Sequence, residues 1–596
     1  MCLGTFRRNR EARFRDFGLQ AEREEYMRMN GWAMLALGFL ASPAFAQSGR
    51  SMADEYEKQI KSAEVVGALG TDLFGDQVNF YTGSTSFVHT DVNLTGNHAL
   101  PVNLVREYRM EVQGEVPRKG MFGDWDIQIP HLQGVFHLQW ESMDGSATRC
   151  SNPSAPPKVT YQGTSFDGPE YWSGAQLHLP GGGSQEMLKV VAENPNKPTG
   201  GLTYPWVTNN QWYFSCFASA NASGEGFLAH APDGTRYWFD WLASRAVAPI
   251  SKGSPTPTML AASNTADGVT PFIANGYVLP RREIWLLPTR AEDRFGNTVS
   301  YTYDATNRMR LTRITSSDGR SLTFTYNAGG YVGTATDGQR TWTYEYTGQS
   351  LTGVVLPDGS RWQYVLSALN IASFETSEAG LCGGAEIWTG GDATGIITHP
   401  SGAQGQFVFR PTLHGRSYVT RSCIALPGGS DYYARFAKRF ATYALKQKTI
   451  SGPGLPTYQW QYAYGVPNDS YADECSAGCA DTKTVEVTGP GKFQRYTFGN
   501  RFQQTDGKLL KLETGTSPTA IQRVEVTTYQ LDPTGQPYPI RVGRSPFIRS
   551  DRTAEPLMPL KSTTISQQGT TFSSVVNSYD QYARPTNVTK GSAPSP

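Results

Sequence analysis

The stretch that decides the fold is DRFGNTVSYTYDATNRMRLTRITSSDGRSLTFTYNAGGYVGTATDGQRTWTYEYTGQSLTGVVLPDGSRWQY, residues 293–364. Gly296, Gly319, Gly338 and Gly359 recur in it at intervals of 23, 19 and 21 residues. Each glycine is followed by two aromatic residues separated by one position. A spacing of two places both aromatics on one face of a β-strand. The stretch therefore predicts a structural repeat of about 20 residues.

The repeated aromatic pairs are the candidate core of this array. They are Tyr301, Tyr303, Phe324, Tyr326, Tyr344, Tyr346, Trp362 and Tyr364, and Tyr579 holds the same place in a later unit. Asp318-Gly319 and Asp358-Gly359 stand between alternating runs, which is a leading signal for a hairpin turn. Each repeat is therefore predicted to be one β-hairpin. Because an isolated hairpin is marginal in water, neighbouring hairpins must join into one sheet to bury their aromatic face.

The rest of the chain divides around this array. Related units return near residues 460–464, 496–510 and 578–585, so the repeat region is predicted over 281–596. Residues 71–280 show apolar residues alternating between glycine-containing turns and are predicted as a β-rich entry domain. Residues 47–70 have the composition of a short helix.

The composition fits an all-β protein and argues against a polyanion partner. The chain of 596 residues has 62 Gly, 30 Tyr, 28 Phe and 13 Trp, which suit many short strands joined by tight turns. It carries 53 Lys plus Arg against 52 Asp plus Glu, a net charge of +1. No overall field would draw it to nucleic acid, so nucleic acid is not an expected partner.

Residues 1–46 are predicted to be an upstream extension followed by a secretory signal peptide. Arg28 precedes an apolar run from Trp32 to Leu40, and Ala44-Phe45-Ala46 offers a cleavage site of small residues. A retained membrane anchor and a short buried helix are the alternatives, although the run is shorter than the roughly 20 residues that span a bilayer. We expect an exported protein, periplasmic, at the cell surface or secreted, with no membrane span after signal removal.

The cysteines fit an oxidising compartment. Removal of the leader leaves an even set of six, which in an exported chain predicts disulfides. They are Cys150, Cys216, Cys382, Cys423, Cys475 and Cys479. Six cysteines allow 15 connectivities, and only Cys475 with Cys479 stands out as a pair. Their spacing also resembles half of a zinc site, but no second Cys or His cluster follows, and we predict no metal.

The repeats resemble the YD-repeat, or Rhs (rearrangement hot spot), family. Tyr301-Thr302-Tyr303-Asp304, followed by Leu311, Ile314 and Asp318-Gly319, is similar to the family repeat, and so is the segment from Ser578 to Pro585. The resemblance covers residues 70–590 and implies a ribbon of hairpins that spirals into a shell enclosing a toxin. Since the sequence stops at Pro596 without the family's core region and variable tail, it implies only a curved, partly open sheet here.

The sequence offers no constellation for catalysis. It contains no Gly-x-Ser-x-Gly elbow, and its eight His residues show no metal-ligand spacing. His131 and His137 flank Gly134, and the glycines at 181–183 lack the Lys-Ser or Lys-Thr of a phosphate loop. We therefore expect no enzyme and no cofactor, although a hydrolase with its active site dispersed among loops is an alternative that predicts a cleft with a perturbed carboxylate or histidine.

The function expected is that of an exported structural protein, a scaffold or partial encapsulating shell related to polymorphic toxin delivery and interbacterial competition. Its expected partner is an Rhs core or toxin polypeptide encoded downstream, or else cell-surface glycans or protein. The alternative from another class is a secreted or surface adhesin, a carbohydrate-binding β-protein. Half-open sheets leave unpaired strand edges, so the structural hypothesis predicts an edge that awaits another chain.

Overall fold

The computed structural model describes residues 73–110, 120–142, 144–172, 174–181, 183–190, 197–252, 263–265, 268–270, 277–370, 375–378, 386–421, 423–425, 432–434, 438–531 and 558–595. All of them belong to one compact unit, residues 50–596. The predicted signal peptide, the helix predicted within 47–70 and Cys382 lie outside the described residues, as does the side chain of Cys423.

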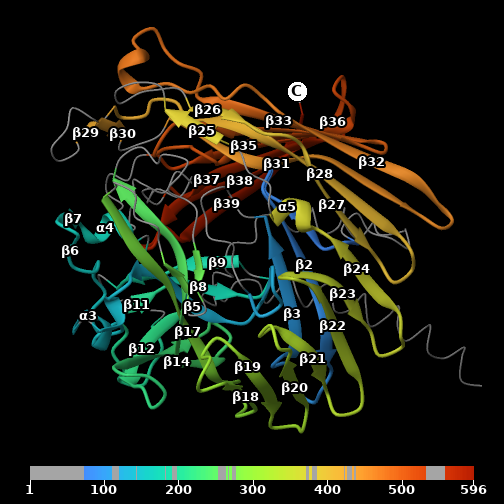
Figure 1. Cartoon of the computed structure of the whole chain (residues 1–596). Helices are drawn as coiled ribbons and strands as arrows, with labels where there is room; N and C mark the ends of the chain where they lie inside the picture. The colour runs from blue at the N-terminus through green and yellow to red at the C-terminus, as the bar shows by residue number, and fades with distance from the viewer. Residues whose placement is uncertain are drawn as a thin grey trace, which may run out of the picture. The chain divides into compact units, whose positions relative to one another are not determined.

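The all-β prediction is confirmed, and the described strands form one large antiparallel sheet of 27 strands, a small sheet of four and four two-stranded sheets (Figure 1). Two of the two-stranded sheets are β6 (Val159–Tyr161) with β7 (Thr164–Phe166), and β15 (Ser263–Thr265) with β16 (Gly268–Thr270). The small sheet contains β1 (Asp76–Val78), β2 (Thr85–Leu94), β3 (Val102–Arg109) and β4 (Trp125–Ile127). The main run of the large sheet is, in spatial order, β10 (Leu188–Lys189), β11 (Trp206–Val207), β12 (Tyr213–Ala218), β13 (Glu225–His230), β14 (Arg236–Lys252), β17 (Tyr277–Glu292), β18 (Thr298–Tyr303), β19 (Leu311–Ser316), β20 (Ser321–Tyr326), β21 (Val332–Thr336), β22 (Thr341–Thr347), β23 (Ser350–Val355), β24 (Arg361–Val365), β27 (Ala393–Thr398), β28 (Gln404–Gly415), β31 (Arg439–Gly452), β32 (Leu455–Tyr464), β33 (Thr482–Gly489), β34 (Lys492–Gly499), β35 (Leu509–Ser517), β36 (Ala520–Tyr529), β37 (Leu560–Gln567), β38 (Thr570–Tyr579) and β39 (Pro585–Pro594).

The large sheet is a meander with one branch. Consecutive strands pair antiparallel from β18 to β39, and the two-stranded hairpins β25 (Glu375–Glu378) with β26 (Glu386–Thr389), and β29 (Cys423–Ala425) with β30 (Tyr432–Ala434), are inserted between sheet strands. The branch forms at β17, which pairs with β14 along one edge and with both β18 and β5 (His131–His137) along the other. β8 (Gln176–Leu179) and β9 (Gly183–Glu186) follow β5. The entry region and the repeats therefore share one sheet, and residue 280 lies inside β17.

The repeated glycines sit in the turns that open each hairpin. Gly296, Gly319, Gly338 and Gly359 have φ between +83° and +92°, and a Cβ at any of them would meet nothing within 4 Å. Glycine is therefore required at these positions by the positive φ of the backbone and not by close contacts with neighbouring atoms. The neighbouring aspartate supports the turn: the Asp337 carboxylate, for example, accepts hydrogen bonds from the backbone N–H groups two and three residues on, at 2.9 and 2.7 Å.

The recurrent tyrosine ties each hairpin to the strand before it. In six strands of the array the last Tyr donates its hydroxyl to a backbone carbonyl of the preceding strand in the sheet. The bonds run from Tyr303 to Pro288 (2.8 Å), Tyr326 to Leu311 (2.7 Å), Tyr346 to Val332 (2.7 Å), Tyr464 to Leu445 (2.9 Å), Tyr529 to Leu509 (3.1 Å) and Tyr579 to Leu560 (2.6 Å). We call these bonds the tyrosine latches.

A β-bulge accompanies most of the latches. In five of the six, the pairing with the following strand shifts register immediately before the latch tyrosine. A bulge bends its strand and increases the local twist, so bulges repeated along one side curve the whole sheet. After Tyr303 and Tyr579, an aspartate accepts backbone N–H bonds and closes the next turn.

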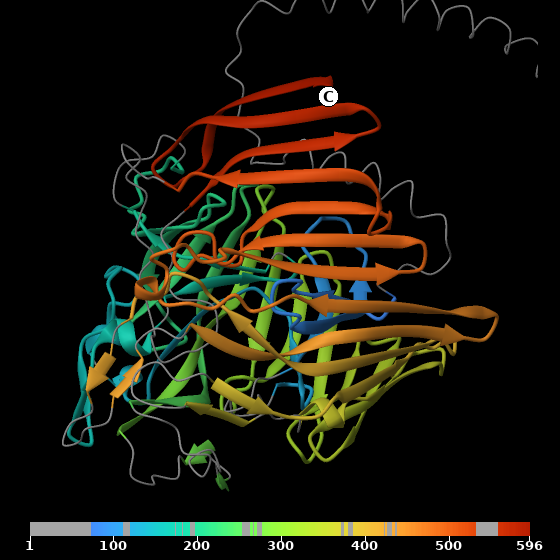
Figure 2. The same cartoon turned by 90° about the horizontal axis from the view of Figure 1, so that it is seen from above.

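The small sheet packs on one face of the large one, and together they enclose the main core (Figure 2). Phe87, Tyr108 and Trp125 from the small sheet share this core with the repeat residues Tyr344 and Phe407. Fully burying a side chain of this size stabilises the fold by roughly 1.5–3 kcal/mol relative to leaving it exposed. The inner face of the repeats is therefore covered by the chain's own N-terminal strands.

The packing thins toward the C-terminal end of the sheet. Burial falls from β33, where Val485 and Val487 are in a core cluster, to β39, where nine of ten residues are exposed. Among the described residues β39 pairs only with β38. The turn that precedes it bends back, because Tyr582 packs with Tyr213 and Val207 at the beginning of the large sheet. The sheet thus returns on itself through side chains and is not closed by backbone pairing of β39.

Helices are minor elements of the described chain. Short ones that the sequence pattern did not predict are α3 (Asp144–Ala147), α4 (Gly168–Tyr171) and α5 (Ser367–Asn370), with two 3-10 turns, η1 (Trp140–Ser142) and η3 (Ala472–Glu474). Four residues make about one turn, which is too short to show amphipathic periodicity. No described helix has the length and apolar character needed to cross a bilayer.

Candidate functional site

The structure places the predicted repeat aromatics in the core. Tyr301, Tyr303, Phe324, Tyr344, Tyr364 and Tyr579 are buried, and Tyr326, Tyr346 and Trp362 are partly buried against the same core or its rim. Their rings are used for packing and their hydroxyls for the latches or for buried polar contacts. They do not form an open aromatic surface on which a sugar could stack.

A buried ion pair holds the small sheet to the repeats. Arg106 is completely buried and contacts Asp91 at 2.7 Å, and its guanidinium also donates to the Tyr364 hydroxyl. The Tyr344 hydroxyl donates to the same Asp91 carboxylate at 3.0 Å. Burial is the largest single influence and opposes the charge on Arg106, but Asp91 together with Tyr364 and Tyr344 outweighs it and raises the pKa of the guanidinium. Two repeat tyrosines are thus specific partners of the entry region.

A polar cleft lies where β3, β4, β5, β8, β14 and β17 meet. Its cavity volume is about 40 Å³, and it is lined by His131, His178, Glu107, Asp126 and Arg245, among others. The Arg245 guanidinium bridges two carboxylates, at 2.5 Å to Asp126 and 2.6 Å to the fully buried Glu283. Asp126 is therefore paired with a cation, as is Glu107 through Arg109 at 2.8 Å. Asp124, which also lines the cleft, instead accepts hydrogen bonds from the Leu351 backbone N–H at 2.9 Å and the Asn370 amide at 2.6 Å, and burial raises the pKa of its carboxyl.

The two histidines of the polar cleft are neutral. Burial lowers the pKa of His131 to about 3 and also lowers the pKa of His178. His131 donates from Nδ1 to the Ile129 carbonyl at 2.8 Å, which leaves Nε2 as a buried acceptor without a partner. The His131 ring also stacks on Trp285, with centroids 3.8 Å apart.

His178 forms the nearest approach to a catalytic arrangement in this cleft. Its Nδ1 lies 3.2 Å from the Ser184 hydroxyl, and its Nε2 lies 2.6 Å from Oε1 of Gln128, whose amide donates to Glu107. The Gln128 amide orients the ring but carries no charge to stabilise an imidazolium, as the aspartate of a catalytic triad does. The geometry therefore allows His178 to accept a proton from Ser184. It does not supply the charged partner that would stabilise the transition state of an acyl transfer.

The pairing of His131 with His178 was not predicted from the sequence. The two residues face each other across the β5–β8 ladder, 47 positions apart in the sequence. Nothing in the spacing of His131 and His137 pointed to β8, because a long-range strand register leaves no periodic signal in one sequence. The dispersed-hydrolase alternative predicts a cleft with a perturbed carboxylate or histidine, and this cleft holds both, because burial raises the pKa of Asp124 and lowers the pKa of His131 and of His178. These shifts do not test whether the chain is an enzyme.

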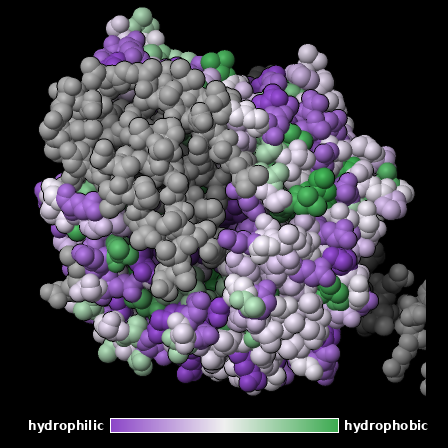
Figure 3. All heavy atoms as spheres, viewed as in Figure 1, coloured by the Kyte–Doolittle hydropathy of each residue, from purple (hydrophilic) through white to green (hydrophobic). Residues whose placement is uncertain are grey.

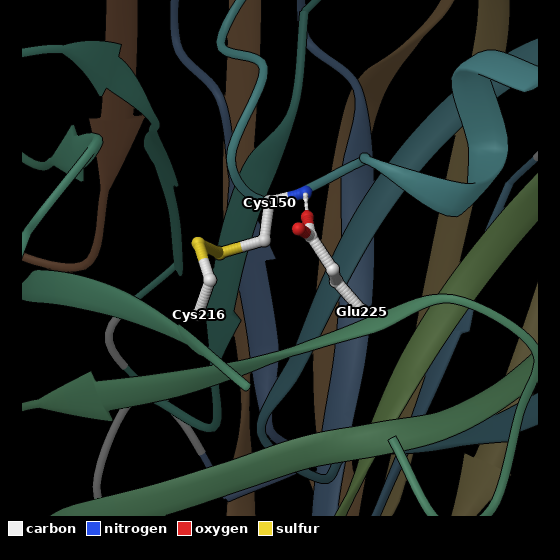
Figure 4. A group of neighbouring side chains, drawn as sticks. All are labelled: Cys150, Cys216 and Glu225. Carbon is white, nitrogen blue, oxygen red and sulfur yellow. Dashed lines mark hydrogen bonds between the residues drawn. A yellow bond between two sulfur atoms is a disulfide. The ribbon is translucent and has the colours of Figure 1, made fainter. Parts of the chain in front are cut away.

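The cysteines are used for disulfides where the structure describes them. Cys150 joins Cys216 and Cys475 joins Cys479, the pair that the spacing singled out. Within the described residues, the one group of three Cys, His, Asp or Glu side chains close enough to share an ion is Cys150, Cys216 and Glu225. Figure 4 shows both sulfurs in the disulfide bond and the Glu225 carboxylate turned to the backbone N–H of Cys150, at 3.0 Å. This group is a poor ligand set for a metal, because cysteine binds metals as a thiolate and both sulfurs here are held in a disulfide.

The visible surface shows no extended apolar patch. The strongly exposed large apolar residues among those described, such as Phe295, Val365 and Val466, occur singly along the chain. Figure 3 shows polar and apolar side chains interspersed over the described part of this face. Scattered apolar residues of this kind are normal for a protein surface.

Comparison with known proteins gives little support to any assignment. No family model matches the sequence, and no curated protein matches it. One similar solved structure is the N-terminal domain of effector protein SpvB from Salmonella typhimurium strain LT2, with 10% identity over 64% of this chain and 95% of that chain and a TM-score of 0.17. Another is the TcdB2-TccC3-TEV structure, with 9% identity over 87% of this chain and 27% of that chain and a TM-score of 0.12. Such low TM-scores establish neither a shared fold nor a shared function.

Proposed function

We propose that this chain is an exported structural protein of the YD-repeat kind, a scaffold or partial shell related to toxin delivery and interbacterial competition. The observation that carries the proposal is the continuous ladder from β18 to β39, built from one repeated hairpin with its turn glycine, latch tyrosine and bulge. A repeat of this design extends by adding identical units and gains its core from neighbours. Such an architecture provides the extended, curved sheet surface that a scaffold or partial shell needs.

The edge of β39 supplies the place for a partner. Within the described parts of the chain its outer edge has no pairing strand, and its exposed side chains and free backbone groups are a ready template for another strand. The partner we propose is a second β-repeat polypeptide, the core or toxin-bearing chain that the sequence hypothesis expects. It would pair along β39 and continue the sheet.

Export is supported by the disulfides. The Cys150–Cys216 bond closes a loop of 66 residues in the entry region. Bonds of this kind persist in oxidising compartments such as the periplasm or the exterior of the cell. The role that we propose is not enzymatic, because it needs no reactive group.

The test is to isolate the tagged chain from its native host after cross-linking. We expect cross-links from Lys590 on β39 to a second chain that carries the same repeat of glycine turns and tyrosines. Val588, on the edge strand, and Val365, on the interior strand β24, are exposed valines and provide matched variants. Val588→Lys is expected to lower recovery of the partner several-fold, because an edge lysine opposes strand addition, whereas Val365→Lys leaves it unchanged.

Two outcomes would count against the proposal. One is a chain that is recovered alone with and without cross-linking. The other is a partner whose recovery is the same for Val588→Lys and Val365→Lys. Selective binding of the isolated chain to glycans, with no protein partner, would instead support the adhesin alternative.

A further inference from the structure

A second cleft lies across the sheet from the polar one. Along β5, His131 lines the polar cleft, whereas Leu132, Gly134 and Phe136 line the second, and along β17 Ile284 and Leu286 line the second. This alternation follows from the period of two in a strand, which sends successive side chains to opposite faces. We call the second space the tryptophan cleft. Its cavity volume is about 100 Å³, larger than that of the polar cleft, which is about 40 Å³.

The walls of the tryptophan cleft are predominantly apolar. Trp140, Trp172 and Trp206 line it together with Phe136 and Met187. Phe136 stacks on Trp140, with ring centroids 4.0 Å apart. Rings fixed in this way give a preformed apolar surface, which binds a ligand with little loss of side-chain freedom.

The disulfide fixes one wall of this cleft. Arg149 and Asn152, which line it, flank Cys150, and Cys150 is bonded to Cys216 on β12. The Trp206 indole donates to the Cys150 carbonyl at 2.7 Å. The loop that closes the cleft is therefore held to the sheet by one covalent bond and one buried hydrogen bond.

Two polar groups of the cleft lack the partners that a closed protein core would provide. Trp172 is 2% exposed, and its indole N–H has no hydrogen-bond partner. Arg149 is buried, and its guanidinium donates only to the carbonyls of Ser146, Ser223 and Glu225. No carboxylate of the described residues forms a salt bridge with it. Burial lowers the pKa of Arg149 to about 10, although the nearby Glu225 and Glu141 carboxylates favour its charge, so the cation is only partly compensated. A buried cation without a bonded anion and a buried donor without an acceptor are both costly.

We propose that the tryptophan cleft binds a small amphiphilic carboxylate, with its apolar body between the tryptophans and its anionic head toward Arg149 and Trp172. The apolar walls match a hydrocarbon or aromatic body. The carboxylate supplies the acceptor that the indole N–H lacks and adds a bonded negative charge to a guanidinium that Glu225 and Glu141 compensate only in part. A sugar would bring many hydroxyl groups into walls that offer few partners for them.

The experiment uses decanoate as the probe, titrated calorimetrically into the full-length oxidised protein. We expect saturable binding of one decanoate per chain. Decyltrimethylammonium, which has the same alkyl chain and the opposite charge, is expected to bind at least tenfold more weakly. Maltose is expected not to bind.

Three variants locate the binding. Trp172→Phe keeps an aromatic side chain but removes the pyrrole part of the indole with its N–H, so it should weaken decanoate binding at least fivefold, the effect of one lost hydrogen bond being roughly 1 kcal/mol. Arg149→Met should weaken it at least tenfold. Ala155→Trp fills the cleft and should abolish binding, whereas Ala328→Trp, in an exposed turn, should leave it unchanged.

Thermal melting shows that each variant is folded before it is titrated. If Arg149→Met does not fold, Trp172→Phe and Ala155→Trp still decide the question. The proposal is overturned if decanoate does not bind, if it binds equally to Ala155→Trp, or if decyltrimethylammonium binds as tightly. Binding of maltose that Ala155→Trp removes would also overturn it and assign the cleft to carbohydrate.

Discussion

At the scale of single residues, the latch tyrosine explains why the sequence repeats an aromatic residue with a hydroxyl. Phenylalanine would fill the same core volume but leave the carbonyl of the preceding strand without a donor. Tyr326→Phe is therefore expected to destabilise the protein by about 1 kcal/mol, because it removes the 2.7 Å bond to Leu311. Tyr458→Phe, on a 39% exposed side chain, should change nothing. Urea unfolding midpoints compare the two, and equal midpoints would show that the latch contributes no stability.

The Arg106–Asp91 pair is a second residue-scale case. Replacing Arg106 with Met leaves Asp91 charged and buried, which should cost about 3–5 kcal/mol at a site where both side chains are almost inaccessible. The double variant Asp91→Asn with Arg106→Met should recover part of this loss, since no charge is left unpaired. Chemical unfolding of the three variants tests the pairing. Additive losses would mean that the two groups do not interact.

Lys483 makes stability depend on pH. Burial lowers its pKa from 10.5 to about 7 in the folded chain, where its ammonium donates to the Tyr81 carbonyl at 2.9 Å and also contacts His414. Between these pH values the unfolded chain binds a proton that the folded chain has lost, so the free energy of unfolding rises with pH. We expect a rise from pH 7 to 9, and Lys483→Met should flatten it. If the free energy of unfolding of Lys483→Met rises with pH as steeply as that of the unchanged protein, groups other than Lys483 cause the rise.

At the scale of elements, the hairpin turns were predictable and the bulges were not. Asp-Gly pairs mark a turn because they satisfy its dihedral angles locally. A bulge depends on how two strands meet, and Tyr326 carries no local sign that its strand will shift register. The hairpins inserted after β24 and β28 interrupt the sequence period of the repeat. An insertion in a turn leaves the sheet intact but moves the next repeat further along the sequence.

The turn glycines give an element-scale prediction. Gly319 has φ of +91° and open space around its Cβ position, so Gly319→Ala should destabilise the protein by roughly 1 kcal/mol through backbone strain alone. Gly391 has equally open space and no positive φ, and Gly391→Ala should be neutral. Thermal melting of the two variants separates conformation from crowding. Equal melting temperatures would contradict the account of the turn.

At the scale of the whole molecule, the sequence predicted one curved antiparallel sheet but not what covers it. The period of the aromatic residues indicates that one face of the sheet is buried. It does not indicate which segment of the chain packs against that face. The packing of β2 and β3 on strands more than 200 residues later, through Arg106 and Tyr364, leaves no local signal. The two clefts beside β5 were missed for the same reason, since each is formed by side chains from entry strands and β17 together.

The large sheet is covered by the small sheet at its centre, whereas its C-terminal strand β39 is exposed. Hydrogen exchange of the purified full-length chain, followed by mass spectrometry, tests this most directly. The account predicts slow exchange in β2, β3 and β18 to β24, with protection falling through β36 to rapid exchange in β39. Protection of β39 equal to that of β20 in the isolated chain would contradict it, because the edge would then already be covered.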